Sequence, residues 1–203
     1  MFDLTQLLIS VPAILIAITF HEFSHGLAAH LLGDPTPQRQ GRLTLNPLPH
    51  LDPVGALMLL VAHFGWAKPV EVNPFYFKGD RRRGMLLVSL AGPLSNIILA
   101  LIGAILYNLL GVSGYLGYFL ILLITINVYL AIFNLLPVPP LDGGKILAGL
   151  LPRRFLPYLD QVEAYGPLIL ILLIVTRISG RILLPIAQAV ITGLFFIASF
   201  VTG

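Results

Sequence analysis

Long apolar runs constrain this chain more than any other feature of its sequence. Five stretches are apolar over most of their length, and they comprise residues 4–32, 84–110, 115–136, 164–176 and 182–201. About 20 apolar residues span a bilayer as an α-helix, and the short fourth stretch approaches that length by including residues 159–163. Only 10% of the 203 residues are charged, against roughly 25% in ordinary globular domains. The sequence therefore predicts an all-α polytopic membrane protein with about five transmembrane helices.

Two proline-rich polar sections, 33–53 and 68–83, interrupt this pattern after the first apolar stretch. The apolar segment between them, 53–66, has only about 14 residues, which favours a re-entrant or interfacial element over a span. Runs 40–45 and 70–77 alternate between apolar and polar residues, as short strands do. We therefore expect a small membrane-associated β element beside the helices.

The composition excludes several classes of protein. The chain has no cysteine, which removes disulfides, thiolate zinc ligands and cysteine nucleophiles. Its net charge is +3, but it has no long basic soluble stretch, so we expect no nucleic-acid partner. The N-terminus lacks a basic region, so its apolar stretch is not expected to be a cleaved signal peptide. The length suits a single membrane-embedded domain, 1–203, with a core of about 4–150 and C-terminal helices at about 160–203.

Charge and geometry both indicate that segment 53–66 does not cross the membrane. Without that crossing, ten of the twelve Lys and Arg residues share one face, which the positive-inside rule makes cytoplasmic. The stretches 4–32 and 115–136 then run parallel, so their C-terminal ends reach the same face. This topology leaves the N-terminus outside the cell.

Two histidines and a glutamate lie inside the first apolar stretch, in the pattern His21-Glu22-Phe23-Ser24-His25. Positions i and i+4 share one helical face, so both imidazoles can reach one metal ion. Glu22 lies beside them, where it can polarise a metal-bound water. Ionisable groups at membrane depth are costly and mark functional sites. The pattern is short, however, and two histidines packed at a helix interface are the alternative.

A catalytic zinc ion takes three protein ligands and keeps an open position for water, so a third ligand is required. The candidates are the remaining acidic and histidine side chains near the polar sections, namely Asp34, Asp52, Glu71, Asp142, His30, His50 and His63. His30 faces elsewhere, because it lies about 140° round the helix from His25. Asp142 follows a run in which prolines end a helix and glycines permit a tight turn. A carboxylate there lies at membrane depth on non-helical backbone, which is tolerated only beside protein or a watery cavity, although a role in capping helix 143–151 remains open.

Polar residues elsewhere in the apolar stretches and turns have more ordinary interpretations. Asn96 and Asn127 need hydrogen-bond partners in lipid, so we expect both to bond to other helices and Asn96 to support the function. Pro93 and Gly92 either kink their helix or allow close packing. His50 and Asp52 are interpreted as a polar turn rather than a second metal site.

Together, these motifs resemble the site-2 protease family of intramembrane zinc metalloproteases, peptidase family M50. That family has HExxH on one membrane helix and N-x-x-P…L-D-G at the end of another. The matches here are His21-Glu22-Phe23-Ser24-His25 and Asn134…Pro137…Leu141-Asp142-Gly143. Segment 91–96 is similar to the family's G-P-x-x-N-type motif. Segments 41–47 and 65–69 look like the compact prokaryotic branch, which has no PDZ or CBS domain.

The resemblance implies a role for each matching residue. His21, His25 and Asp142 would bind one Zn²⁺ per chain, and Glu22 would act as general base and acid. Asn134 is similar to the family asparagine that helps to hold the substrate carbonyl or the oxyanion.

The resemblance also implies an endopeptidase that hydrolyses peptide bonds within or near transmembrane segments of other membrane proteins, in regulated intramembrane proteolysis. The enzyme would lie in a prokaryotic cell membrane with its active site toward the cytoplasmic side. Its partners would be transmembrane protein substrates and membrane lipid, and the sequence assigns no oligomeric state.

Two other functions use the same residue types. A membrane metal-ion transporter also places His and Asp at membrane depth, and a proteolytically inactive scaffold could bind transmembrane partners. A transporter needs no general base such as Glu22, and the inverted repeats of many transporters are not evident. The presence of every inferred catalytic residue argues against an inactive scaffold.

Overall fold

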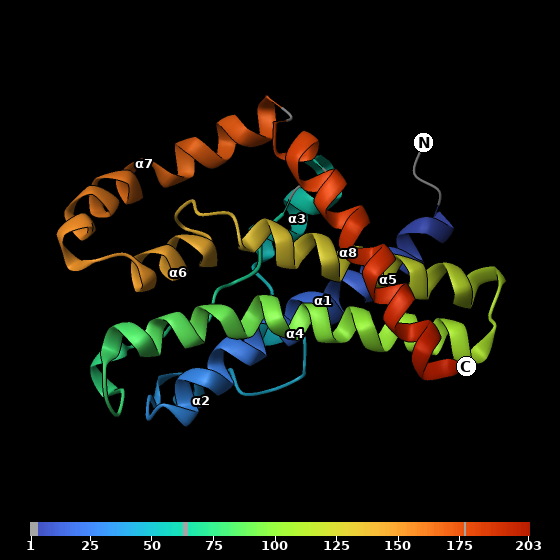
Figure 1. The fold of residues 1–203 in the computed structure, drawn as a ribbon, viewed down its shortest axis with the longest axis horizontal. Coiled ribbons are helices and arrows are strands. Elements are labelled where there is room, and N and C mark those ends of the chain that lie inside the picture. Colours follow the sequence, from blue (N-terminus) through green and yellow to red (C-terminus); the bar gives the residue numbers. More distant parts are fainter. Residues whose placement is uncertain (1–3, 63–64, 177) are drawn as a thin grey trace.

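The computed structural model describes residues 4–62, 65–176 and 178–203, and most of them are helical (Figure 1). The helices, in chain order, are α1 (Leu4–Leu31), α2 (Thr36–Arg39), α3 (Pro53–Ala62), α4 (Arg81–Leu110), α5 (Gly114–Asn134), α6 (Asp142–Leu150), α7 (Leu156–Val175) and α8 (Ile178–Thr202). Short 3₁₀ helices also occur, namely η1 (Leu48–His50), η2 (Pro74–Tyr76) and η3 (Arg153–Phe155).

Among the described residues, four helices are long and apolar enough to cross a membrane: α1, α4, α5 and α8. This confirms the polytopic helical prediction, but the predicted count of about five is wrong by one. The missing span is the stretch 164–176, which lies in α7. The residues expected to lengthen it include Asp160 and Glu163, so its apolar helical part, Gln161–Leu173, remains shorter than a bilayer requires.

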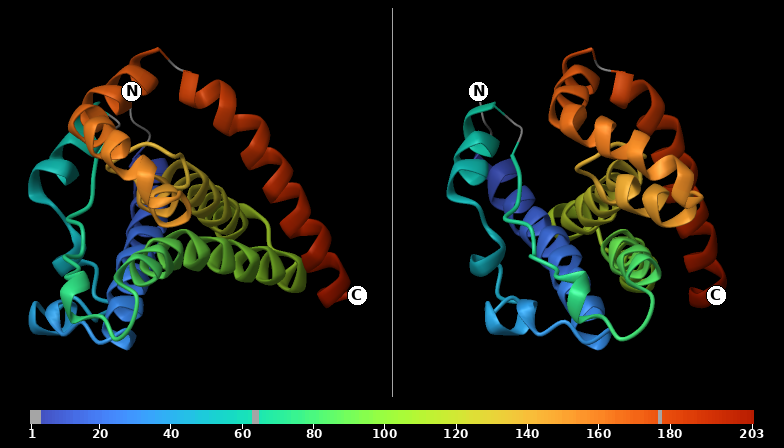
Figure 2. Two further views of the ribbon diagram at one scale, coloured as in Figure 1. Left: turned by 60° about the vertical axis from the view of Figure 1, so that its left-hand side comes forward. Right: turned by 90° about the vertical axis from the view of Figure 1, so that its left-hand side faces the viewer.

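Helices α1, α4 and α5 form the centre of the molecule, with α1 and α5 parallel and α4 running the opposite way (Figure 1). Helix α8 packs across the outer side of α4 and α5 (Figure 2). Small residues such as Ala100 and Ala104 are fully buried where α4 meets Ile124 and Val128 of α5. Small side chains let helix backbones approach closely, which is how membrane helices gain packing energy.

Helix α3 has ten residues, Pro53–Ala62, and covers most of the segment that we expected not to span. Ten helical residues extend about 15 Å, roughly half of the hydrocarbon thickness. This length agrees with the prediction of a re-entrant or interfacial element, although residues 63–64 at its end lie outside the described residues.

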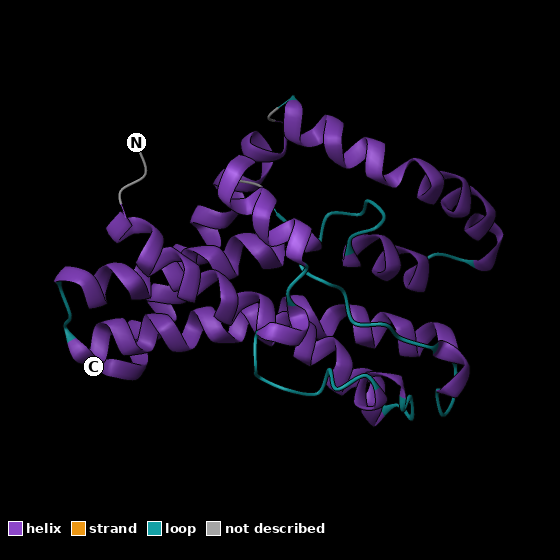
Figure 3. Cartoon of the chain, turned by 180° about the vertical axis from the view of Figure 1, so that it is seen from behind, coloured by secondary structure: helices purple, strands orange, loops and turns teal. Residues whose placement is uncertain are grey.

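The predicted β element is wrong. No described residue belongs to a strand (Figure 3), and an isolated antiparallel bridge joins Leu51 to Ala67. Residues 40–45 form turns, and 70–77 runs extended until the 3₁₀ helix η2 begins at Pro74. Prolines cannot donate to a ladder, and the backbone N–H groups of Val70 and Asn73 bond to carboxylates. Alternation here therefore reflects an extended loop rather than a paired strand.

Candidate metal centre

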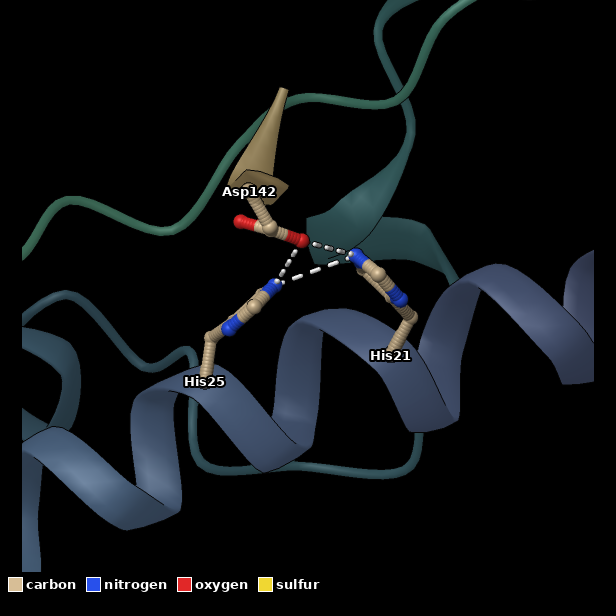
Figure 4. Close-up of side chains that lie close together, drawn as sticks. All are labelled: His21, His25 and Asp142. Atoms are coloured by element: carbon tan, nitrogen blue, oxygen red, sulfur yellow. Dashed lines mark hydrogen bonds and ion pairs between the residues drawn. The ribbon is translucent and has the colours of Figure 1, made fainter. Parts of the chain in front are cut away.

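Three buried side chains from distant parts of the chain meet at one point (Figure 4). His21 and His25 lie one turn apart on α1, and their Nε2 atoms are 3.0 Å apart. Asp142, the first residue of α6, places its Oδ2 atom 3.2 Å from Nε2 of His21 and 3.1 Å from Nε2 of His25. Among the described residues, this is the one group of histidine and acidic side chains close enough to share a metal ion.

The backbone between α5 and α6 directs Asp142 toward α1. Helix α5 ends at Asn134, and the chain turns back tightly before α6 begins. A Cβ atom on Gly143 would lie 2.2 Å from the carbonyl oxygen of Leu136, so this turn needs glycine. The N-cap position of α6 is Leu141, without a side-chain cap. Asp142 therefore faces the histidines, and the capping alternative is not seen.

The outward-facing Nδ1 atoms determine what the cluster can bind. Nδ1 of His21 lies 2.7 Å from Oδ1 of Asn96, and Nδ1 of His25 lies 2.7 Å from the carbonyl oxygen of Val88. Both partners are acceptors, so in the neutral imidazoles each Nδ1 carries the proton. Each Nε2 then presents a lone pair toward Oδ2 of Asp142. Three acceptors facing one another need a cation between them.

The donor set fits zinc. A tetrahedral zinc ion with bonds of about 2.0–2.1 Å separates its ligand atoms by about 3.3 Å, close to the three distances between the Nε2 and Oδ2 atoms. Asp142 completes this donor set with an anionic oxygen, since a carboxylate binds a metal ion in its ionised form.

Asn96 orients His21 through a chain of hydrogen bonds across three helices. Its Nδ2 donates to the carbonyl oxygen of Ala17 at 3.0 Å and to Oδ1 of Asn127 at 2.8 Å. Asn127 in turn donates to the carbonyl oxygen of Leu123. This confirms that both asparagines bond to other groups inside the helix bundle. Hydrogen bonds of this kind fix the ring orientation of metal-binding histidines.

Gly92 lets α4 pass directly beside the imidazoles. A Cβ atom there would lie 2.3 Å from Nε2 of His25 and 2.7 Å from Cε1 of His21. Helix α4 continues unbroken through Pro93. The sequence left both a kink and close helix packing open for Gly92 and Pro93. The structure shows close packing of Gly92 against the two histidines.

Glu22 faces an extended segment, residues 67–73, that runs alongside α1. Its Oε2 atom accepts a hydrogen bond from the backbone N–H of Val70 at 2.8 Å. The fully buried Asp34 anchors the far end of the segment by accepting from the N–H of Asn73 at 2.7 Å. The buried guanidinium of Arg42 bonds the carbonyl oxygens of Pro49 and Lys68 at the near end.

Sequence reasoning missed these two anchors. It weighed Asp34 only as a metal ligand and counted Arg42 only among the basic residues of one membrane face. Burial lowers the pKa of Arg42, and the charges of Glu22 and Glu71 partly offset that effect. The only indication of a role for Arg42 was its charge inside a proline-rich polar section. The carbonyl groups that it binds lie 7 and 26 residues away along the chain.

Two cavities meet at the cluster. One of about 120 Å³ contains His21, Glu22, His25 and Asp142 in its wall. The other, about 290 Å³, is mostly apolar and is lined by residues that include Ile18, Trp66, Phe133 and Leu170. His21, Glu22, Asn134 and Pro140 belong to both walls. Asn134 thus lies where the two cavities adjoin, and its Nδ2 donates to the carbonyl oxygen of Leu130 at 2.9 Å.

The remaining metal-ligand candidates lie elsewhere. His50 is buried, with Nε2 2.9 Å from the carbonyl oxygen of Thr44. Asp52 accepts from the N–H of Gly55 at the start of α3, and Glu71 accepts from Gln40. His50 and Asp52 therefore act in turns, as predicted. His63 lies outside the described residues.

Comparisons with known proteins agree on one family. Residues 111–176 match the family model described as peptidase family M50. The chain is 43% identical over 188 residues to "Putative zinc metalloprotease YwhC" of Bacillus subtilis, covering 88% of this chain and 85% of that protein. It is also similar to "Putative zinc metalloprotease Rip2" of Mycolicibacterium smegmatis, with 29% identity over 82% of this chain and 66% of that protein. No solved structure matches the chain significantly.

The similarity to the Bacillus subtilis protein extends over most of both chains. The name of that protein mentions zinc, and His21, His25 and Asp142 of this chain lie close enough together to hold a metal ion. The described residues also include four helices that are long and apolar enough to span a bilayer. The chain therefore belongs to peptidase family M50, and it is an integral membrane zinc metalloprotease.

Proposed function

We propose that this protein is an intramembrane endopeptidase that hydrolyses peptide bonds within or near transmembrane segments of other membrane proteins. The observation that carries the proposal is the position of the metal-capable cluster. His21 and His25 lie inside a helix that is long and apolar enough to span the bilayer, and a mostly apolar cavity adjoins them. A site at that depth is suited to an apolar substrate segment.

We assign Nε2 of His21, Nε2 of His25 and Oδ2 of Asp142 as the ligands of one zinc ion. When bound, the ion supplies Lewis-acid polarisation of a carbonyl and lowers the pKa of water toward about 7. The protein's part is to hold the ligands in place. Asn96 and the carbonyl oxygen of Val88 do so from the far sides of the two rings.

Glu22 is the proposed general base and acid. Its carboxylate lines both cavities, so it can take a proton from the attacking water and pass it to the leaving amine. The N–H of Val70 holds Oε2, which orients the group and leaves Oε1 to face the reactants. General acid–base catalysis of this kind contributes about 10²–10⁴-fold in rate.

Asn134 is the proposed holder of the substrate carbonyl or the oxyanion. Its side chain stands between the apolar cavity and the smaller cavity around the cluster. Its Nδ2 currently donates to its own helix, so a rotation would turn an N–H toward the carbonyl. A substrate segment must also unwind locally there, because the carbonyls of a helix are already hydrogen-bonded.

We further place the active site toward the cytoplasmic side of a prokaryotic cell membrane. The basic residues that flank α4 and follow α6 support this orientation by the positive-inside rule. The relatives named above come from bacteria, which supports the assignment of the membrane.

Cleavage of a single-span model substrate by the purified protein in a bilayer tests this proposal. Product masses should place the cut within the span or a few residues from it. Glu22→Gln should keep its zinc and lose about 10²–10⁴-fold in cleavage rate, while Glu163→Gln, on α7, serves as the matched control. Cuts confined to soluble flanks, or equal cleavage by Glu22→Gln, would contradict it.

A further inference from the structure

A third cavity, of about 650 Å³, lies at the N-terminal end of α4. Helix α6 runs along this part of α4 (Figure 1), and residues of α6 and η3 also line the cavity. Four cationic residues line the cavity together with one acidic residue, and they are Arg81, Arg82, Lys145, Arg153 and Asp80. The metalloprotease mechanism uses none of these charges.

The protein neutralises only part of the positive charge around the cavity, since the single carboxylate of Asp80 accompanies four cationic side chains there and interacts electrostatically with Arg153. Among the described residues, no lysine or arginine forms a close ion pair with a carboxylate, and the close ion pairs that do form join histidines to Asp142. Asp80 is engaged as the N-cap of α4, accepting from the N–H of Arg83 at 2.8 Å. Arg82 donates through Nε to the carbonyl oxygen of Ala148, but its buried Nη2 has no hydrogen-bond partner. An unmet charged donor in a cavity wall is costly, and an anion nearby would compensate it.

The cavity also lies at the depth of the lipid headgroups. Helix α4 is a candidate membrane span that begins at Arg81, so its first turn lies at the membrane surface. Phe75 is 74% exposed, and the guanidinium of Arg81 lies 4.4 Å from its ring centroid. Exposed aromatic rings beside basic residues are typical of the membrane interface. The apolar side chains of Met85 and Leu156 complete the wall, so the cavity is cationic and apolar together.

We propose that this cavity binds the phosphate of an anionic phospholipid headgroup, with the apolar wall contacting the lipid backbone. An acidic peptide is the other anionic ligand to consider. Segments that flank transmembrane helices on the cytoplasmic side are enriched in Lys and Arg, so the flank of a typical substrate would be repelled. Met85 and Lys145 also line the cavity at the metal centre. A bound lipid would therefore touch a wall of the active site.

Lipid binding can be measured without any substrate, so its outcome is independent of the proposed proteolysis. The full chain in detergent micelles is titrated with phosphatidylglycerol or phosphatidylcholine, and bound lipid is counted by native mass spectrometry. We expect preferential binding of phosphatidylglycerol. The double variant Arg81→Gln/Arg153→Gln should weaken it by about ten- to thirtyfold, since each cation contributes about three- to fivefold. Arg82 stays unchanged because it holds Ala148.

The matched control is Arg83→Gln/Arg154→Gln, which removes the same charge from neighbouring positions outside the cavity. It should change the affinity by less than about threefold, as expected for diffuse attraction alone. Equal losses in both double variants would overturn the proposal. So would displacement of the lipid by inorganic phosphate, which would mark a free-anion site, or by an acidic peptide, which would mark a peptide site. Zinc content checks that each variant is folded.

Discussion

The metal centre depends on Gly92, which has no side chain, as much as on the side chains that form the cluster. His21 and His25 can turn toward Asp142 because α4 offers Gly92 at the point of contact, where a Cβ atom would lie 2.3 Å from Nε2 of His25. Asn96, one turn further along α4, then fixes the ring of His21. Helix α4 thus supplies both the space and the orientation for the histidines of α1.

Gly92→Ala is therefore expected to disrupt the cluster although it changes no charged group. The added methyl must displace an imidazole, and the zinc affinity should fall by about 10–100-fold, as it does when the support of a ligand is lost. Competition with a chelator measures the affinity. Gly193→Ala is the matched control, since a Cβ atom there meets nothing within 4 Å. Unchanged affinity in Gly92→Ala would show that α4 does not set the imidazole positions.

At this scale the sequence predicted the residues that meet and the bonding of Asn96, but not the side chains that hold the loop beside them. The i, i+4 spacing predicted that His21 and His25 share one face, whereas Asp142 was added by the resemblance to the site-2 protease family, because the residues alone left a capping role open. The roles of Asp34 and Arg42 could not be predicted, because each depends on backbone groups of a distant loop. Nothing in their local pattern identifies those partners.

At the scale of elements, long apolar runs of sequence predicted helices correctly, whereas short alternating runs predicted strands that do not form. The bounds of α4 and α5 follow from apolar runs closed by recognisable ends, such as Asp80 capping α4 and Gly111 ending it with a φ of 52°. The runs 40–45 and 70–77 were misassigned because strand pairing is not local. Residues 67–73 are instead held extended by side chains of Glu22 and Asp34.

The parallel arrangement of α1 and α5 makes a prediction about membrane sidedness. The chain has no cysteine, so single cysteines can report accessibility to an impermeant maleimide. Gln38→Cys, after α1, and Arg154→Cys, after α6, should label from the cytoplasmic side. Ser113→Cys, between α4 and α5, should label from outside. If α3 crossed the membrane, Gln38→Cys and Arg154→Cys would label from opposite sides, and the arrangement would be wrong.

At the scale of the whole molecule, two cavities of different character adjoin the metal centre. The small cavity contains the metal-capable cluster and Glu22, whereas the larger apolar cavity takes part of its wall from Leu170 of α7. Helix α7 is held against the α5–α6 connection, since a Cβ atom on Gly166 would lie 2.2 Å from the carbonyl oxygen of Pro139. The sequence predicted this stretch only as a further transmembrane helix, and its contribution to the cavity wall follows from packing that the sequence does not show.

The most direct test of the account is the zinc content of the purified protein and of Asp142→Ala. Wild type should hold about one zinc ion per chain, as a site with three protein ligands does. Asp142→Ala should lose it under the same dialysis, whereas Asp52→Ala, whose carboxylate only caps α3, should keep it. Zinc retained at the wild-type level by Asp142→Ala would contradict the assignment of this residue and, with it, the proposed catalytic centre.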